Sequence, residues 1–114
     1  MAIERHGTTQ RYSDICAYGD TVYLVETPQT LDANVATQTR EVLAGVEKLL
    51  EQAGSDKTRL LMVTIYLRNI DDAIAVNTVW DRWIPRGTAP TRVCVEAKLA
   101  HHDFLIEVAV IAAR

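Results

Sequence analysis

Two charged residues in the last quarter of the sequence have types and a spacing that could do chemistry together. Arg92 stands near the start of the strand-like run "APTRVCVEAKL", residues 89–99, and Glu107 is the charged residue inside the apolar run "FLIEVAV". A guanidinium offers a planar fork of donors that matches a carboxylate. A nearby glutamate could orient or deprotonate a water molecule. The pair could therefore form an anion site that binds an organic acid next to an activated water.

The same two residues also have a purely structural interpretation, a cross-strand ion pair, because a buried charge needs a partner. The break between the last two apolar runs is short, so we expect these runs to form an antiparallel hairpin. With its loop centred near residues 100 to 101, Cys94 lies opposite Glu107, and Arg92 lies one diagonal step away on the same face. Both interpretations stay open, and both make Arg92 and Glu107 neighbours.

Other reactive side chains give weaker patterns. His101, His102 and Asp103 are adjacent in a predicted turn and point apart, so we expect a solvated loop and no metal site. Cys94 would need a base beside it to act as a nucleophile, so we expect it to line a pocket wall. Ser13 has no visible histidine partner for a catalytic triad. The sequence therefore predicts no metal site.

The elements that must position these residues follow from turn signals and apolar spacing. In chain order we expect a hairpin over 12–26 around Gly19-Asp20, a helix over 33–53 ended by Gly54, a central strand over 58–68, a helix over 69–84 ended by Pro85, and strands over 89–99 and 104–112. We expect Asp32 to cap the first helix. Asn77, on the apolar stripe of the second helix, is expected to hydrogen-bond a loop backbone.

This order, β-β-α-β-α-β-β, predicts an α+β fold with two helices on one face of a mixed sheet. Strand 58–68 is apolar on both faces, and the last strand is apolar at nearly every position. Two helices cover about one face of a small sheet, and soluble monomers rarely expose a large apolar patch. We therefore expect an oligomer in which sheets pack on one another.

Length and composition limit the remaining possibilities. The chain of 114 residues is 48% apolar and 24% charged, with a net charge of −3, and we expect residues 1–114 to form a single domain. The acidic balance does not predict a nucleic-acid partner. No apolar run reaches the roughly 18 residues of a membrane span, and the first residues lack a signal-peptide core, so we expect a cytoplasmic protein. Cys16 and Cys94 have no metal or redox spacing, and we expect no disulfide.

The quoted segments together resemble the reactive intermediate deaminase family, also called Rid or YjgF-type. "APTRVCVEAKL" followed by "IEVAVIA" is similar to its signature of a Pro, one residue, an Arg and, after a short loop, a Glu in a final apolar strand. "QTREVLAGVEKLLEQAGSDKTRLLMVTIYL" resembles its helix and central strand. "LDA", "QT" and the tryptophan-rich "NTVWDRW" point to the YoaB-like branch of the family.

The resemblance implies a chorismate-mutase-like α/β sandwich and a homotrimer whose sheets form a central barrel, with clefts between subunits. It implies that Arg92 binds the substrate carboxylate, Glu107 positions the hydrolytic water, Cys94 lines the pocket and Tyr12 approaches the ligand. The implied activity is hydrolysis of reactive 2-imino or enamine acids to 2-keto acids and ammonia, without a metal or organic cofactor. The alternative is a pocket that only binds a small carboxylate metabolite. A ribonuclease activity, sometimes attached to this family, has no basic stripe to support it here.

One segment departs from the family pattern. After the second strand the family has a small residue, a Gly and a Gln before its Pro, and that Gly lets backbone amides approach the ligand. Here Val25, Glu26 and Thr27 occupy this stretch, and Glu26 brings a negative charge to it. We expect Glu26 either to turn out of the pocket or to set the choice of ligand.

Overall fold

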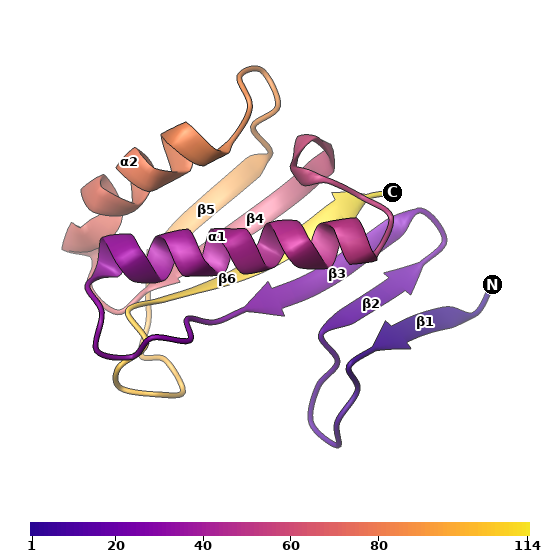
Figure 1. The fold of residues 1–114 in the computed structure, drawn as a ribbon, viewed down its shortest axis with the longest axis horizontal. Coiled ribbons are helices and arrows are strands. Elements are labelled where there is room, and N and C mark those ends of the chain that lie inside the picture. Colours follow the sequence, from indigo (N-terminus) through magenta and orange to yellow (C-terminus); the bar gives the residue numbers. More distant parts are fainter.

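In the computed structural model, which describes residues 1–114, six strands form one mixed sheet and two helices lie across one of its faces (Figure 1). The strands are β1 (Ile3–His6), β2 (Ile15–Tyr18), β3 (Thr21–Glu26), β4 (Leu60–Leu67), β5 (Thr91–Glu96) and β6 (Ile106–Ala113). The helices are α1 (Val35–Gln52) and α2 (Ala73–Trp83), with 3₁₀ turns at Lys57–Arg59 and Ile70–Asp72. The α+β class and the placement of both helices on one face are as predicted.

The spatial order of the strands is β1-β2-β3-β6-β4-β5, and only the β4–β5 pair is parallel. The predicted hairpin between the last two strands is therefore wrong, because β4 lies between β5 and β6. The unit β4-α2-β5 is instead a parallel crossover through a helix, which is the usual way to connect parallel strands. Strand β6 completes the sheet by pairing with β3 on one side and β4 on the other.

The prediction also lacked the first strand. β1 pairs with β2 in antiparallel fashion, but all four of its residues are exposed. Its sequence, Ile-Glu-Arg-His, has no alternation of apolar and polar residues that would indicate a half-buried strand. Its position at the sheet edge explains why no such pattern is needed.

The core lies between the sheet and the helices. Helix α1 buries Val42, Val46 and Leu50 along one stripe, and β6 buries alternate residues from Ile106 onward. The cap of α1 is Asn34, whose Oδ1 accepts from the Thr37 amide at 2.9 Å, and not Asp32 as predicted.

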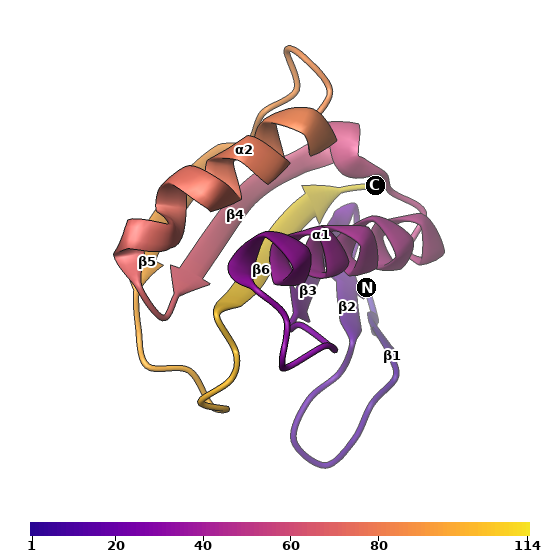
Figure 2. The ribbon, with the colours of Figure 1, turned by 60° about the vertical axis from the view of Figure 1, so that its left-hand side comes forward.

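The opposite face of the sheet is not covered by any element of the chain (Figure 2). Large apolar side chains lie exposed along it. They are Ile3, Tyr18, Tyr23, Val25, Met62, Val93 and Val95, each between 37% and 52% exposed. The two-faced strands of the sequence predicted an uncovered apolar face, and such a face is present, although most of its large exposed side chains come from β1, β2, β3 and β5. Neither helix is both long enough and apolar enough to cross a membrane.

Candidate functional site

Arg92 lies at the start of β5, on the outer edge of the sheet, and its side chain is on the helix-covered face. Its strand partner is the buried Val63, which fixes this orientation. The guanidinium Nη2 donates to Oδ1 of Asn77 at 2.7 Å, and the guanidinium carbon lies 5.1 Å from the ring centroid of Trp80. Asn77 and Trp80 are three residues apart on α2, so they present adjacent side chains to the arginine. Helix α2 thus fixes the position of the guanidinium from one side.

Arg92 marks a candidate site because most of its hydrogen-bond donors have no partner within the chain. A guanidinium has five N–H donors, and only the bond to Asn77 is made within the chain. Arg92 forms no ion pair, since the ion pairs of the chain join other residues. The interpretation of Arg92 as one half of a structural ion pair with Glu107 is therefore wrong. Arg92 is an exposed residue, and four of its donors have no partner within the chain.

Asn77 has a different partner from the one predicted. It was expected to hydrogen-bond a loop backbone, but its side-chain oxygen accepts from Arg92. The reason is the parallel crossover, which carries α2 back over the strand that contains Arg92. Asn77 and Trp80 are the two residues of the site that the sequence pattern did not identify as supports for Arg92. Their i, i+3 spacing on the helix that precedes the arginine strand was the available signal.

Cys94 lies two residues beyond Arg92 on the same face, packed against the core beside Ile65. Burial raises the pKa of the Cys94 thiol, and the positive charge of Arg92 offsets this only in part. A protonated thiol is a poor nucleophile. The thiol is therefore not set up for nucleophilic catalysis, and its place in a ligand-pocket wall stays a prediction.

Glu107 lies on the opposite face of the sheet from Arg92. It pairs with Tyr66 on β4, while Arg92 pairs with Val63, so the two side chains point to different faces. The predicted register, which made Arg92, Cys94 and Glu107 neighbours, is wrong for this reason. Within one chain the sheet itself separates the arginine from the glutamate.

Tyr12 is even farther from Arg92 within one chain. It is 63% exposed in the loop between β1 and β2, at the edge of the sheet opposite to β5. A row of paired residues crosses the sheet between them, through Ile15, Leu24, Val110, Val63 and Arg92. Four strand spacings of about 4.8 Å give about 19 Å along the sheet. Tyr12 and Arg92 can share a ligand only if they come from two copies of the chain.

Glu26 does not point to the open face. Its strand partner is the buried Val108, and its carboxylate packs against α1 at Gly45. A Cβ added at Gly45 would lie 2.6 Å from Oε2 of Glu26, so only glycine leaves this space free. Burial raises the pKa of Glu26, and the nearby charge of Asp14 adds to the effect. The side chain is therefore turned away from the open face and toward the first helix.

The loop before Glu107 is held in place by two polar side chains. The buried Gln38 of α1 donates to the carbonyl of Asp103 at 3.0 Å and accepts from the amide of Leu105 at 2.9 Å. Arg68 donates to the carbonyls of His101 and Phe104, at 2.8 and 3.0 Å. No group of three or more His, Cys, Asp or Glu side chains in the chain could hold a metal ion.

The chain is thus a small α+β protein whose mixed sheet has one helix-covered face and one apolar open face. Arg92, held by Asn77 and Trp80 at the sheet edge, is its candidate site for an organic acid. The family model described as Endoribonuclease L-PSP matches residues 3–114. The RutC family protein YoaB of Escherichia coli is 36% identical over 113 residues, with 99% of each chain covered. The chain therefore belongs to this family, the Rid or YjgF family.

Solved structures agree with this assignment. A protein from Pseudomonas aeruginosa, described as uncharacterized, has a TM-score of 0.96 at 36% identity, with 99% of each chain covered. A member of the YjgF protein family from Neisseria meningitidis has a TM-score of 0.95 at 37% identity, covering 100% of this chain and 96% of its own. The fold of the family is thus present over essentially the whole chain.

Proposed function

We propose that this protein hydrolyses reactive 2-imino or enamine acids to 2-keto acids and ammonia, in a cleft between copies of the chain. The observation that carries the proposal is Arg92, which is held by Asn77 and Trp80 yet keeps four of its five donors free. Such a group is suited to a substrate carboxylate. Membership of the Rid family is consistent with this reaction.

The reaction needs little from the protein beyond positioning and one base. Water adds to the imine carbon next to the carboxylate, and the resulting carbinolamine expels ammonia as the keto group forms. Arg92 would hold the carboxylate and so fix the imine carbon in place. Glu107 would accept the proton of the attacking water. An enamine substrate first becomes an imine when a proton adds to the carbon that lies next to the imine carbon, on the side away from the carboxylate.

A site of this composition requires more than one chain. Glu107 and Tyr12 do not reach Arg92 within the monomer, for the reasons given above. The open face supplies an apolar surface over which copies could pack, and its seven large exposed side chains favour such packing. We propose a homotrimer in which the open faces form a central barrel and Glu107 and Tyr12 of one copy approach Arg92 of the next.

The direct test is an assay with 2-iminopropionate generated in situ, which follows loss of the imine and accumulation of pyruvate. The protein should accelerate both, and Arg92→Ala should abolish the acceleration. Lys98→Ala, which removes another exposed cation shortly after β5, is the matched control and should retain activity. No acceleration by the wild-type protein would refute the proposed reaction.

A mixing experiment tests whether the site is shared. Arg92→Ala and Glu107→Gln subunits, each inactive alone, are refolded together in equal amounts. If Arg92 and Glu107 come from neighbouring copies, random mixing in a cyclic oligomer leaves about one quarter of the sites intact. If both residues come from the same chain, no site is restored, and the shared arrangement is wrong.

A second candidate is binding of a small carboxylate metabolite without turnover. The separation of Glu107 from Arg92 within the chain favours it, because anion binding needs the arginine alone. Glu107→Gln distinguishes the two candidates. Under the first it retains ligand binding and loses hydrolysis, and under the second there is no hydrolysis in the wild-type protein to lose.

A further inference from the structure

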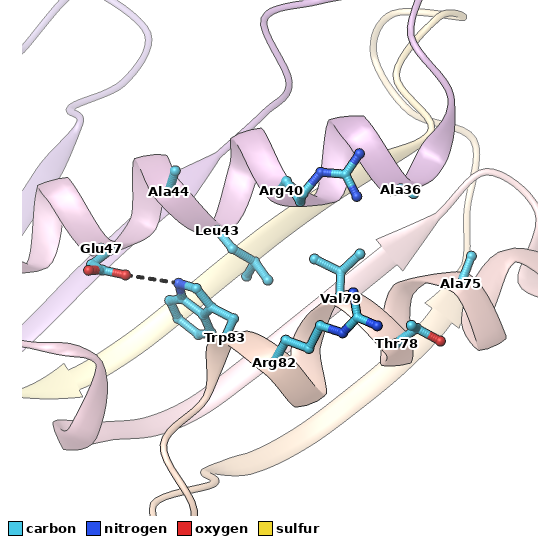
Figure 3. A pocket seen from close by; sticks show the side chains of 10 residues that line it. All are labelled: Ala36, Arg40, Leu43, Ala44, Glu47, Ala75, Thr78, Val79, Arg82 and Trp83. Atoms are coloured by element: carbon cyan, nitrogen blue, oxygen red, sulfur yellow. Dashed lines mark hydrogen bonds between the residues drawn. The ribbon is translucent and has the colours of Figure 1, made fainter.

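A groove of about 540 Å³ runs between α1 and α2 on the outer surface of the helices, and ten side chains from these two helices line it (Figure 3). Its apolar floor includes the buried Leu43 and the partly buried Val79. Alanines at positions 36, 44 and 75 leave the space open, because their side chains are short. A groove of this size is within the range of small-molecule sites.

Two arginines without an anionic partner lie between the two ends of the groove. Arg40 of α1 and Arg82 of α2 extend along opposite walls, with Val79 between them (Figure 3). The Arg40 side chain donates to Oγ1 of Thr37 at 3.1 Å, whereas the Arg82 side chain makes no hydrogen bond within the chain. Neither guanidinium takes part in an ion pair. In a protein with a net charge of −3, two uncompensated cations across an apolar floor form a local site for an anion.

At the Trp83 end of the groove, the negative charge of Glu47 is compensated within the chain. Glu47 accepts from the indole nitrogen of Trp83 at 3.0 Å (Figure 3), and it also pairs with Lys57 at 3.2 Å. The Lys57 ammonium also lies 5.5 Å from the centre of the Trp83 ring. The charge of Glu47 is therefore satisfied, and the indole presents an apolar wall. The groove thus has an aromatic end at Trp83, two arginines over an apolar floor in its middle, and short side chains at its far end (Figure 3).

We infer that this groove binds an amphiphilic organic anion, a carboxylate carried on an apolar chain. The carboxylate is held between Arg40 and Arg82, because two guanidinium groups supply charge-assisted donors from opposite sides. The chain lies over Leu43 and Val79 and ends against Trp83. Arg92 is held by Asn77 and Trp80, which do not line the groove, and Trp83 packs against Trp80 with ring centroids 5.5 Å apart. The groove is therefore a second site with its own charged residues, separate from the anion site at Arg92.

The test uses octanoate as the probe, with octanol and acetate as comparison ligands. Binding is followed by the indole N–H signal of Trp83 in a proton–nitrogen correlation spectrum, which Trp83→Phe assigns. Octanoate should shift this signal with saturation. Octanol, which lacks the charge, and acetate, which lacks the chain, should each bind about tenfold more weakly or not at all.

The variants are Arg40→Gln, Arg82→Gln and the two combined. Each single change should weaken octanoate binding about tenfold, because it removes one charge-assisted partner, and the double change should weaken it further. Lys48→Gln, an exposed α1 cation outside the groove, should leave binding unchanged. Imine hydrolysis should be unaffected in all of them, and Arg92→Ala should still bind octanoate.

Three results would overturn the inference. In the first, octanol binds as tightly as octanoate. In the second, the double arginine variant binds octanoate like the wild-type protein. In the third, octanoate shifts amide signals of the open face while the Trp83 signal stays fixed, which places the ligand on the sheet. Because hydrolysis is measured in parallel, failure of the groove site is separate from failure of the proposed reaction.

Discussion

Replacing Arg92 by alanine should leave the protein folded and remove the proposed imine hydrolysis. The substitution deletes one exposed hydrogen bond to Asn77, which contributes about 1 kcal/mol. It also deletes the contact with the Trp80 ring, which contributes about 0.5–1 kcal/mol at an exposed position. The expected loss of stability is therefore about 1–2 kcal/mol. Breaking a buried ion pair would instead cost about 3–5 kcal/mol.

This difference is measurable. For a domain of this size 1 kcal/mol lowers the melting temperature by about 4–5 °C, so Arg92→Ala should melt about 4–10 °C below the wild-type protein. Both proteins must be compared at one concentration, because self-association adds stability. Imine hydrolysis, measured by kcat/KM, should fall at least about a hundredfold, since the group that orients the carboxylate is gone.

Two further variants sharpen this prediction. Arg92→Lys keeps the charge but loses the planar fork, so it cannot bond Asn77 and a carboxylate in the same way, and it should restore little activity. Asn77→Ala leaves the guanidinium in place but less fixed, so KM should rise more than kcat falls. Full activity in Arg92→Lys would refute the role of the fork. So would an Arg92→Ala protein that is destabilised by more than about 3 kcal/mol while its folded fraction still hydrolyses imines.

Other predictions concern the open face and the contact between β3 and α1. Val93→Glu places a charge on the open face and should turn the proposed trimer into 12.7 kDa monomers in sedimentation equilibrium. Ile74→Glu, on the exposed side of α2, should leave the trimer intact, and a monomeric wild-type protein would contradict the proposal. Burial raises the pKa of Glu26 above 4.5, so the folded state holds this proton more tightly than the unfolded chain does, and stability falls as the pH rises above about 4.5. Glu26→Gln should therefore be more stable than the wild-type protein at pH 7 and equally stable at pH 4 in urea unfolding, and a pH-independent difference would count against the buried carboxylate. Gly45→Ala should stabilise α1 by about 1 kcal/mol, but only in a Glu26→Ala background, because the Glu26 carboxylate occupies the space that the new Cβ needs. Additive effects of the two substitutions in a double-mutant cycle would show that these residues do not interact.

The sequence predicted most of the secondary structure because the signals are local. Helix α1 has a continuous apolar stripe, and Gly54 follows it with a φ of +82°, as expected for the residue after a helix. The hairpin around Gly19 is likewise a local turn signal. These features depend on neighbouring residues, so no tertiary information is needed to recognise them.

The pairing of β5 could not be predicted in the same way. The short break before β6 looked like a hairpin loop, but residues 97–105 carry the chain past β4 to a place on its far side. Arg92 was identified correctly as an unusual strand residue, while its contacts with Asn77 and Trp80 depend on where α2 crosses the sheet. The position of a helix over a distant strand produces no periodic pattern of apolar residues, so the sequence alone does not indicate it.

The position of β6 also has a consequence for how the protein is made. This strand joins the β1-β2-β3 part of the sheet to the β4-β5 part, and it is the last of the six strands along the chain. Since β3 ends at Glu26 and β6 begins at Ile106, the β1-β2-β3 part can pair well before β6 is available. Until it emerges, β3 and β4 each present an unpaired edge to other nascent chains. A central strand of the sheet is thus the last to be made, and the risk of misassembly is highest before β6 pairs with β3 and β4.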